Sequence, residues 1–194
     1  MQKTKKELGL SWIIFKTVAI FLTSYLIFLV LWVQVKDYYG KAVTYTVSEM
    51  ITVVKDVKFE KIIQEKDIIR VRFSPLRHKA GVGIEIPIKT SNYTFNAPLT
   101  FAIMAALFTF IRRRVRAYVE AVLILFFIHL LYVFSCEILN LTMAFINKGF
   151  EPVNKLLIFV YQFLWQFTDN MVIRFEPFLI GLYLFIRFKA GRKT

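Results

Sequence analysis

The chain has 194 residues, of which 57% are apolar and 17% aromatic, and it contains 21 phenylalanines but only 7 glycines and 5 prolines. Ordinary soluble domains are roughly 45–50% apolar, so this composition excludes a disordered chain and favours a helical membrane protein. The single cysteine, Cys136, excludes an internal disulfide and a zinc site built from several thiolates. The net charge of +13 can reflect membrane topology, because lysine and arginine accumulate on the cytoplasmic side of membrane spans.

The first apolar run covers residues 10–35. It is long enough to cross a hydrocarbon layer of about 30 Å at about 1.5 Å per residue. Lysines precede it and no small-residue cleavage site follows, so we expect a retained anchor with a cytoplasmic N-terminus over residues 1–35. Lys16 lies about one turn inside the run and is expected to extend back to the headgroups.

Residues 36–96 differ abruptly in composition, with 11 basic and 7 acidic residues among short apolar pieces. Apolar residues at 43, 47, 50, 51 and 54 have the spacing of one helical stripe. Apolar residues then alternate with other residues over 57–60, 69–73 and 82–88, which predicts three strands. Residues 64–67 form the expected tight connection, 74–81 a basic loop, and Pro87 places the third strand at an edge. We expect a small extracytoplasmic α/β domain.

Three further spans are predicted, and we assign them to residues 97–194, although the apolar run of the first one starts slightly earlier. The first of these begins at about residue 93 and ends at 111, followed by four arginines that mark a cytoplasmic loop and can contact anionic lipid headgroups: Arg112, Arg113, Arg114 and Arg116. The next span covers 117–141, and 142–154 are expected as an external turn. Residues 156–186 are too long for one simple span. We expect 156–167 at the outer interface and a final span over 171–188, kinked at Pro177, with one continuous tilted helix as the alternative.

The predicted fold class is therefore an α+β membrane protein with about four transmembrane helices. The helix-plus-three-strand domain is inserted between the first and second of them, and both termini lie in the cytoplasm. If the host is a bacterium, such a chain is expected in its inner membrane, with the external domain in the periplasm.

Ionisable residues inside spans cost about 2.5–3.5 kcal/mol each on insertion scales, so each predicts a polar partner. Five residues form this set: His129, Glu137, Asp169, Arg174 and Glu176. Glu137 and Arg174 fall in the outer part of antiparallel spans, where an ion pair between them would lower the cost of burying either. A small transporter subunit using these residues is an alternative, but the carboxylates cluster near one interface and do not form a path across the bilayer.

Cys136 leaves open an intramembrane cysteine enzyme or transpeptidase. Its candidate base, His129, is seven residues away, about 10 Å along a helix, which is too far for a Cys–His hydrogen bond. The sequence predicts no metal site and no cofactor. Nucleic-acid binding is disfavoured as well, because the basic residues are divided between both sides of the membrane.

Four basic residues in the external domain predict an exposed docking surface for a protein partner: Arg70, Arg72, Arg77 and Lys79. The expected contacts of the whole chain are thus membrane lipids and one larger membrane protein.

Three short stretches resemble the small membrane proteins associated with exosortase H, which belong to a bacterial system for sorting proteins at the cell envelope. They are Asn96-Ala97-Pro98-Leu99 at the start of the second span, Cys136-Glu137-Ile138-Leu139 near the end of the third, and Tyr161-Gln162-Phe163-Leu164 before a last span that contains Pro177. The order of an anchor, a strand-rich external region and further spans is also similar. The resemblance implies an accessory, non-catalytic role beside a multi-spanning cysteine transpeptidase, and it supplies no catalytic residues.

Overall fold

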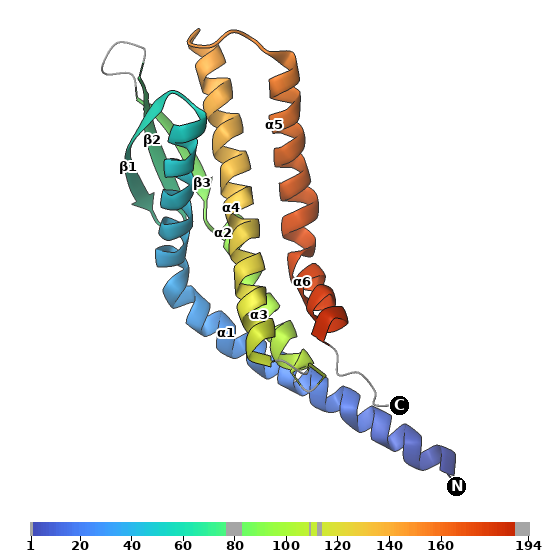
Figure 1. Cartoon of the computed structure of the whole chain (residues 1–194). Helices are drawn as coiled ribbons and strands as arrows, with labels where there is room; N and C mark the ends of the chain where they lie inside the picture. The colour runs from blue at the N-terminus through green and yellow to red at the C-terminus, as the bar shows by residue number, and fades with distance from the viewer. Residues whose placement is uncertain (1, 77–82, 109, 112–113, 189–194) are drawn as a thin grey trace. The chain divides into compact units, whose positions relative to one another are not determined.

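Helix α1 runs without a break from Gln2 to Val54 in the computed structural model, which describes residues 2–76, 83–108, 110–111 and 114–188 (Figure 1). Its 53 residues correspond to about 80 Å at 1.5 Å per residue, more than twice the hydrocarbon thickness. The predicted first span and the predicted helix of the external domain are therefore one element. No proline separates them, and the lone Gly40 does not end the helix.

Three antiparallel strands follow, in the order β1-β2-β3, where the alternating sequence predicts them. They are β1 (Val57–Glu65), β2 (Ile68–Pro75) and β3 (Ile84–Lys89). A two-residue turn, Lys66-Asp67, connects β1 to β2. Pro87 lies in β3, an edge strand, where a residue without an N–H is tolerated.

The C-terminal part of α1 packs in one apolar cluster with the sheet. Val43, Val47 and Ile51 of α1 are fully buried, as are Val71 and Phe73 of β2. The other stripe residues, Met50 and Val54, are exposed. Each fully buried side chain of this size stabilises the folded state by roughly 1.5–3 kcal/mol.

The predicted second span is not one 19-residue helix. It is divided between α2 (Ser91–Thr94) and α3 (Ala97–Leu107). The 11 residues of α3 measure about 16 Å, about half the hydrocarbon thickness. Pro98 stands at the start of α3, where its missing N–H and fixed φ favour the beginning of a helix.

The remaining helices differ from their predicted bounds. Helix α4 extends over Arg114–Asn147, so its last turns replace the first half of the expected external turn at 142–154. Helix α5 (Lys155–Phe167) leads through the π-helical turn η1 (Thr168–Val172) into α6 (Ile173–Phe188). This matches the continuous-helix alternative, with Pro177 inside α6 one turn after the π-helical turn.

The chain divides into two compact units. The helical unit contains the described residues of Met1–Gln34, Asn96–Leu125 and Glu176–Thr194, and the sheet unit contains Val35–Phe95 and Phe126–Phe175 within the same limits. Among the described residues, two helical segments are long and apolar enough to cross a membrane, Ser11–Val54 and Val115–Asn147. The α+β class is confirmed, whereas four crossings and the division into 1–35, 36–96 and 97–194 stay predictions.

Candidate functional site

The outer face of the sheet carries the two predicted docking arginines that the structure describes. Residues Ile69, Val71 and Phe73 of β2 point into the core, so Arg70 and Arg72 lie on the opposite face. Arg77 and Lys79, the other members of the predicted surface, lie outside the described residues.

Both described arginines form ion pairs within the sheet. Arg70 Nε lies 3.1 Å from Glu65 Oε2, and Arg72 Nε lies 3.0 Å from Glu60 Oε2. A second guanidinium nitrogen of Arg72 lies 3.9 Å from Glu85 Oε1. The face therefore carries neighbouring positive and negative side chains and is not a purely basic patch. The sequence pattern did not reveal this, because the glutamates come from β1 and β3, the two strands that flank the arginines of β2.

Apolar side chains surround Arg70 on the same face. The register places Ile63 of β1 and Pro87 of β3 opposite Arg70. Ile68, two residues before Arg70, keeps 36% of its surface exposed. An arginine among exposed apolar residues is the composition found at the centre of protein interfaces.

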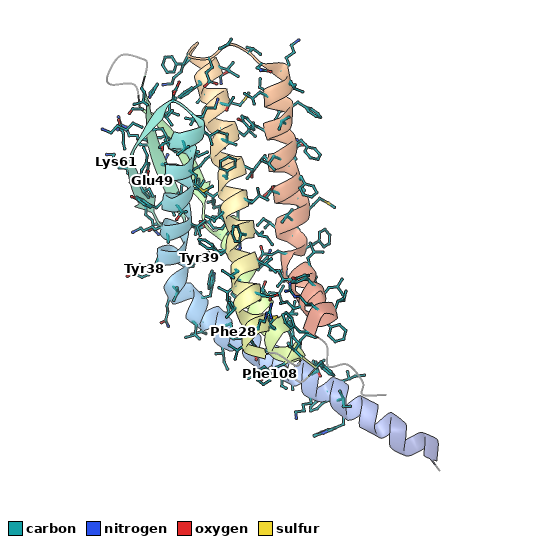
Figure 2. All side chains as sticks on the ribbon, viewed as in Figure 1. Phe28, Tyr38, Tyr39, Glu49, Lys61 and Phe108 are labelled. Atoms are coloured by element: carbon teal, nitrogen blue, oxygen red, sulfur yellow. The ribbon has the colours of Figure 1, made fainter. Side chains whose placement is uncertain are left out.

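The interior of the sheet unit contains a polar contact between α1 and α4. Tyr39 Oη and Nδ1 of the fully buried His129 lie 2.7 Å apart, within hydrogen-bond distance. The ring of Tyr93 packs edge-on against His129 with the centroids 5.4 Å apart. Figure 2 labels Tyr38 and Tyr39 as neighbours on α1; Tyr38 is 75% exposed, whereas Tyr39 bonds to His129. His129 therefore holds two helices together within one unit.

Glu137 makes the second polar contact between these helices. The Ser48 hydroxyl lies 3.1 Å from Oε1 and 3.3 Å from Oε2 of Glu137, and both residues are fully buried. The same hydroxyl also donates to Thr44 O at 2.8 Å. A hydroxyl has one hydrogen to donate, so the carboxyl shares it with a carbonyl of the helix.

The predicted ion pair between Glu137 and Arg174 is not among the ion pairs of the described residues. Arg174 is exposed, whereas Glu137 is fully buried against α1. The expectation placed both residues by depth alone, whereas the rotation of each helix decides which neighbours a side chain meets. Asp169 is half-buried in η1, and Glu176 is buried in α6.

Cys136 is a small buried side chain beside this contact. It is 7% exposed, and Asn140 Nδ2 lies 3.4 Å from its sulfur. His129 Nδ1 lies within hydrogen-bond distance of the Tyr39 phenol. Over the described part of the chain, no three His, Cys, Asp or Glu side chains gather as a metal site would require.

The arginines after α3 are described only in part. Arg112 and Arg113 lie outside the described residues, and Arg114 begins α4. Arg116 Nε lies 3.1 Å from Glu120 Oε1, and Arg187 lies 3.2 Å from the other oxygen of the same carboxylate. Glu120 thus connects α4 and α6 within the helical unit. The role of these arginines in topology and lipid contact stays a prediction.

Sequence reasoning missed the partners that α1 supplies. Thr44 and Ser48 stand four residues apart beside the apolar stripe, so two hydroxyls on a buried helix edge were a usable signal for a polar group opposite. Lys55, whose ammonium lies 2.7 Å from Glu151 Oε2 in the loop before α5, had no such signal. That pair joins residues 96 positions apart.

Comparison with known proteins gives one family. No curated protein and no solved structure matches the chain. A family model described as "Exosortase H-associated membrane protein" matches residues 12–188, a range that contains residues of both units. The resemblance that the short stretches carry is thereby confirmed. The chain belongs to the family of exosortase H-associated membrane proteins.

Proposed function

We propose that this chain is a non-catalytic accessory subunit that docks, in the bacterial inner membrane, with a multi-spanning exosortase-type enzyme. The family match over residues 12–188 carries the proposal, because the family is described by its association with that enzyme. In the proposed topology the chain crosses the membrane four times and presents the sheet outside the cytoplasm.

The outer face of the sheet is the proposed docking surface. It combines Arg70 and Arg72 with exposed apolar side chains, and this combination supports a protein partner. Arg77 and Lys79 extend the proposed surface into the loop after β2. The ion pairs with Glu60 and Glu65 hold the two described arginines in place, which lowers the entropy cost of binding.

The experiment is co-purification from the native membrane. The tagged full-length chain is crosslinked mildly, and the proteins recovered with it are identified by mass spectrometry. Recovery of one multi-spanning cysteine enzyme in near-equal amount supports the proposal. Recovery of the chain alone, or with copies of itself only, overturns it.

A charge swap separates docking from internal stability. Arg70→Glu should reduce recovery of the enzyme by roughly tenfold, as expected for an interface arginine that contributes more than 1 kcal/mol. The double variant Arg70→Glu/Glu65→Arg restores the internal ion pair and should stay defective. Lys148→Glu changes an exposed charge outside the sheet and is the matched control. Full recovery by the double variant would show that Arg70 acts only inside the sheet.

The cysteine alternative needs one variant. Cys136→Ala should retain full function in a complementation assay, because the thiol is buried and lies against the amide of Asn140. Loss of function at normal abundance would favour thiol chemistry over an accessory role.

A further inference from the structure

A groove in the sheet unit lies beside the start of the polar part of α1. Its volume is about 430 Å³, and its lining residues are Asp37, Tyr38 and Lys41 of α1 with Gln64 and Lys66 of the β1–β2 hairpin. The groove is distinct from the outer sheet face, since the proposed docking arginines do not line it.

If residues 16–36 of α1 cross the membrane, as the proposed topology has it, the residues of the groove follow directly after the hydrocarbon-spanning segment in the sequence. Lys16 and Lys36 are separated by 20 residues of one helix, or about 30 Å, which equals the hydrocarbon thickness. Lys41 is about 7.5 Å farther along the helix, a distance close to the depth of one headgroup layer. Tyr38, which stands between Lys36 and Lys41 in the sequence, is 75% exposed, and exposed aromatic residues are typical of a membrane interface.

The charges in the groove have no partners among the described residues. Among the described residues, no ion pair includes Lys41, Lys66 or Asp37. This holds although Asp37 and Lys41 are four residues apart on one helix. The adjacent Lys36 lies 3.9 Å from Asp67, so that pair is compensated. Two cations and one carboxylate therefore line the groove, and no described residue forms an ion pair with any of them.

The hairpin holds its lysine in a conformation that costs energy. Lys66 has a φ of +53°, in the left-handed region where glycine or asparagine is the usual residue. The Gln64 amide donates to Lys66 O at 3.3 Å and supports the turn. Lys66 and Lys41 both line the groove.

We propose that this groove binds the headgroup of a phospholipid of the phosphatidylethanolamine type. The phosphodiester lies against Lys41 and Lys66, and the primary ammonium of the headgroup donates to the Asp37 carboxylate. A phosphate with a primary amine matches two cations and one anion, whereas a headgroup without an amine leaves Asp37 opposed to a like charge.

Native mass spectrometry of the full-length chain in a neutral detergent tests this inference. The probes are short-chain phosphatidylethanolamine, phosphatidylglycerol, phosphatidylcholine and inorganic phosphate. We expect phosphatidylethanolamine to bind more tightly than the other three. Lys41→Gln/Lys66→Gln should weaken its binding about tenfold or more. Lys58→Gln/Lys61→Gln removes the same charge from exposed positions on β1 and should leave binding within about twofold of the parent chain.

The carboxylate is tested separately. Asp37→Ala removes the carboxylate acceptor and should abolish the preference for phosphatidylethanolamine over phosphatidylcholine, whose quaternary ammonium donates no hydrogen bond. Equal binding of all three lipids, equal binding of inorganic phosphate, or equal loss in both lysine double variants would each overturn the inference. Circular dichroism of every variant checks that a loss of binding is not a loss of fold.

Discussion

Buried polar side chains of the sheet unit connect α1 to α4 residue by residue. His129 and Glu137 are separated by eight residues of α4 and meet Tyr39 and Ser48, nine residues apart on α1. A buried polar group that keeps a hydrogen bond avoids most of its desolvation cost, so these contacts fix which faces of the two helices meet.

The Ser48–Glu137 contact gives a prediction at this scale. Ser48→Ala removes the hydroxyl partner of a fully buried carboxyl and should lower the free energy of unfolding by about 1–3 kcal/mol. The double variant Ser48→Ala/Glu137→Leu replaces both groups by apolar ones and should recover most of that loss. Thermal unfolding in detergent measures both, at about 2–4 °C per kcal/mol. If the double variant is instead less stable than Ser48→Ala alone, Glu137 has a further stabilising partner.

Element packing in both units depends on a glycine at a close approach. In the sheet unit a Cβ at Gly40 of α1 would lie 2.5 Å from Thr90 Cγ2, just after β3. In the helical unit a Cβ at Gly181 of α6 would lie 2.7 Å from Ile103 Cγ2 of α3. Small residues let helices approach closely, which is the main source of helix association in lipid.

Gly40→Ala should force α1 away from the residues after β3. Because Thr90 is fully buried and branched, we expect a cost of about 1–3 kcal/mol in thermal unfolding. Thr90→Ser removes the clashing methyl group and keeps the hydroxyl, so Gly40→Ala/Thr90→Ser should regain most of the lost stability. Failure of this rescue would place the strain elsewhere.

Gly181→Leu should separate α6 from α3 in the same manner. The measurement is the amount of monodisperse protein extracted from the membrane, which we expect to fall severalfold. Ile103→Ala opens space opposite Gly181 and should restore part of the yield in the double variant. An unchanged yield for Gly181→Leu alone would contradict close packing of these helices.

At the scale of the whole molecule, the proposed topology places the sheet outside the cytoplasm. The proposed topology predicts that a cysteine replacing Lys58, introduced into a Cys136→Ala chain, reacts with a membrane-impermeant maleimide in spheroplasts. Cysteines replacing Lys3 and Thr194 should react only after lysis, because an even number of crossings places both termini inside. The reverse pattern would contradict the orientation, and a reactive Thr194→Cys alone would indicate an odd number of crossings.

The sequence by itself determined the class of this protein and the positions of its strands. An apolar run longer than a bilayer and alternation at a period of two are local patterns, and they hold whatever the rest of the chain does. Lysines and arginines likewise predict an orientation from their positions alone. For the same reason the short stretches near residues 96, 136 and 161 were enough to indicate the family.

Only the tertiary structure decided which side chains meet. It paired Arg70 and Arg72 with glutamates of the neighbouring strands, placed Glu137 against Ser48 rather than Arg174, and brought Lys66 of the hairpin beside Lys41. It also merged the first span with the helix beside the sheet. Strand register and helix rotation set these neighbours, and both are fixed by packing between segments far apart in sequence.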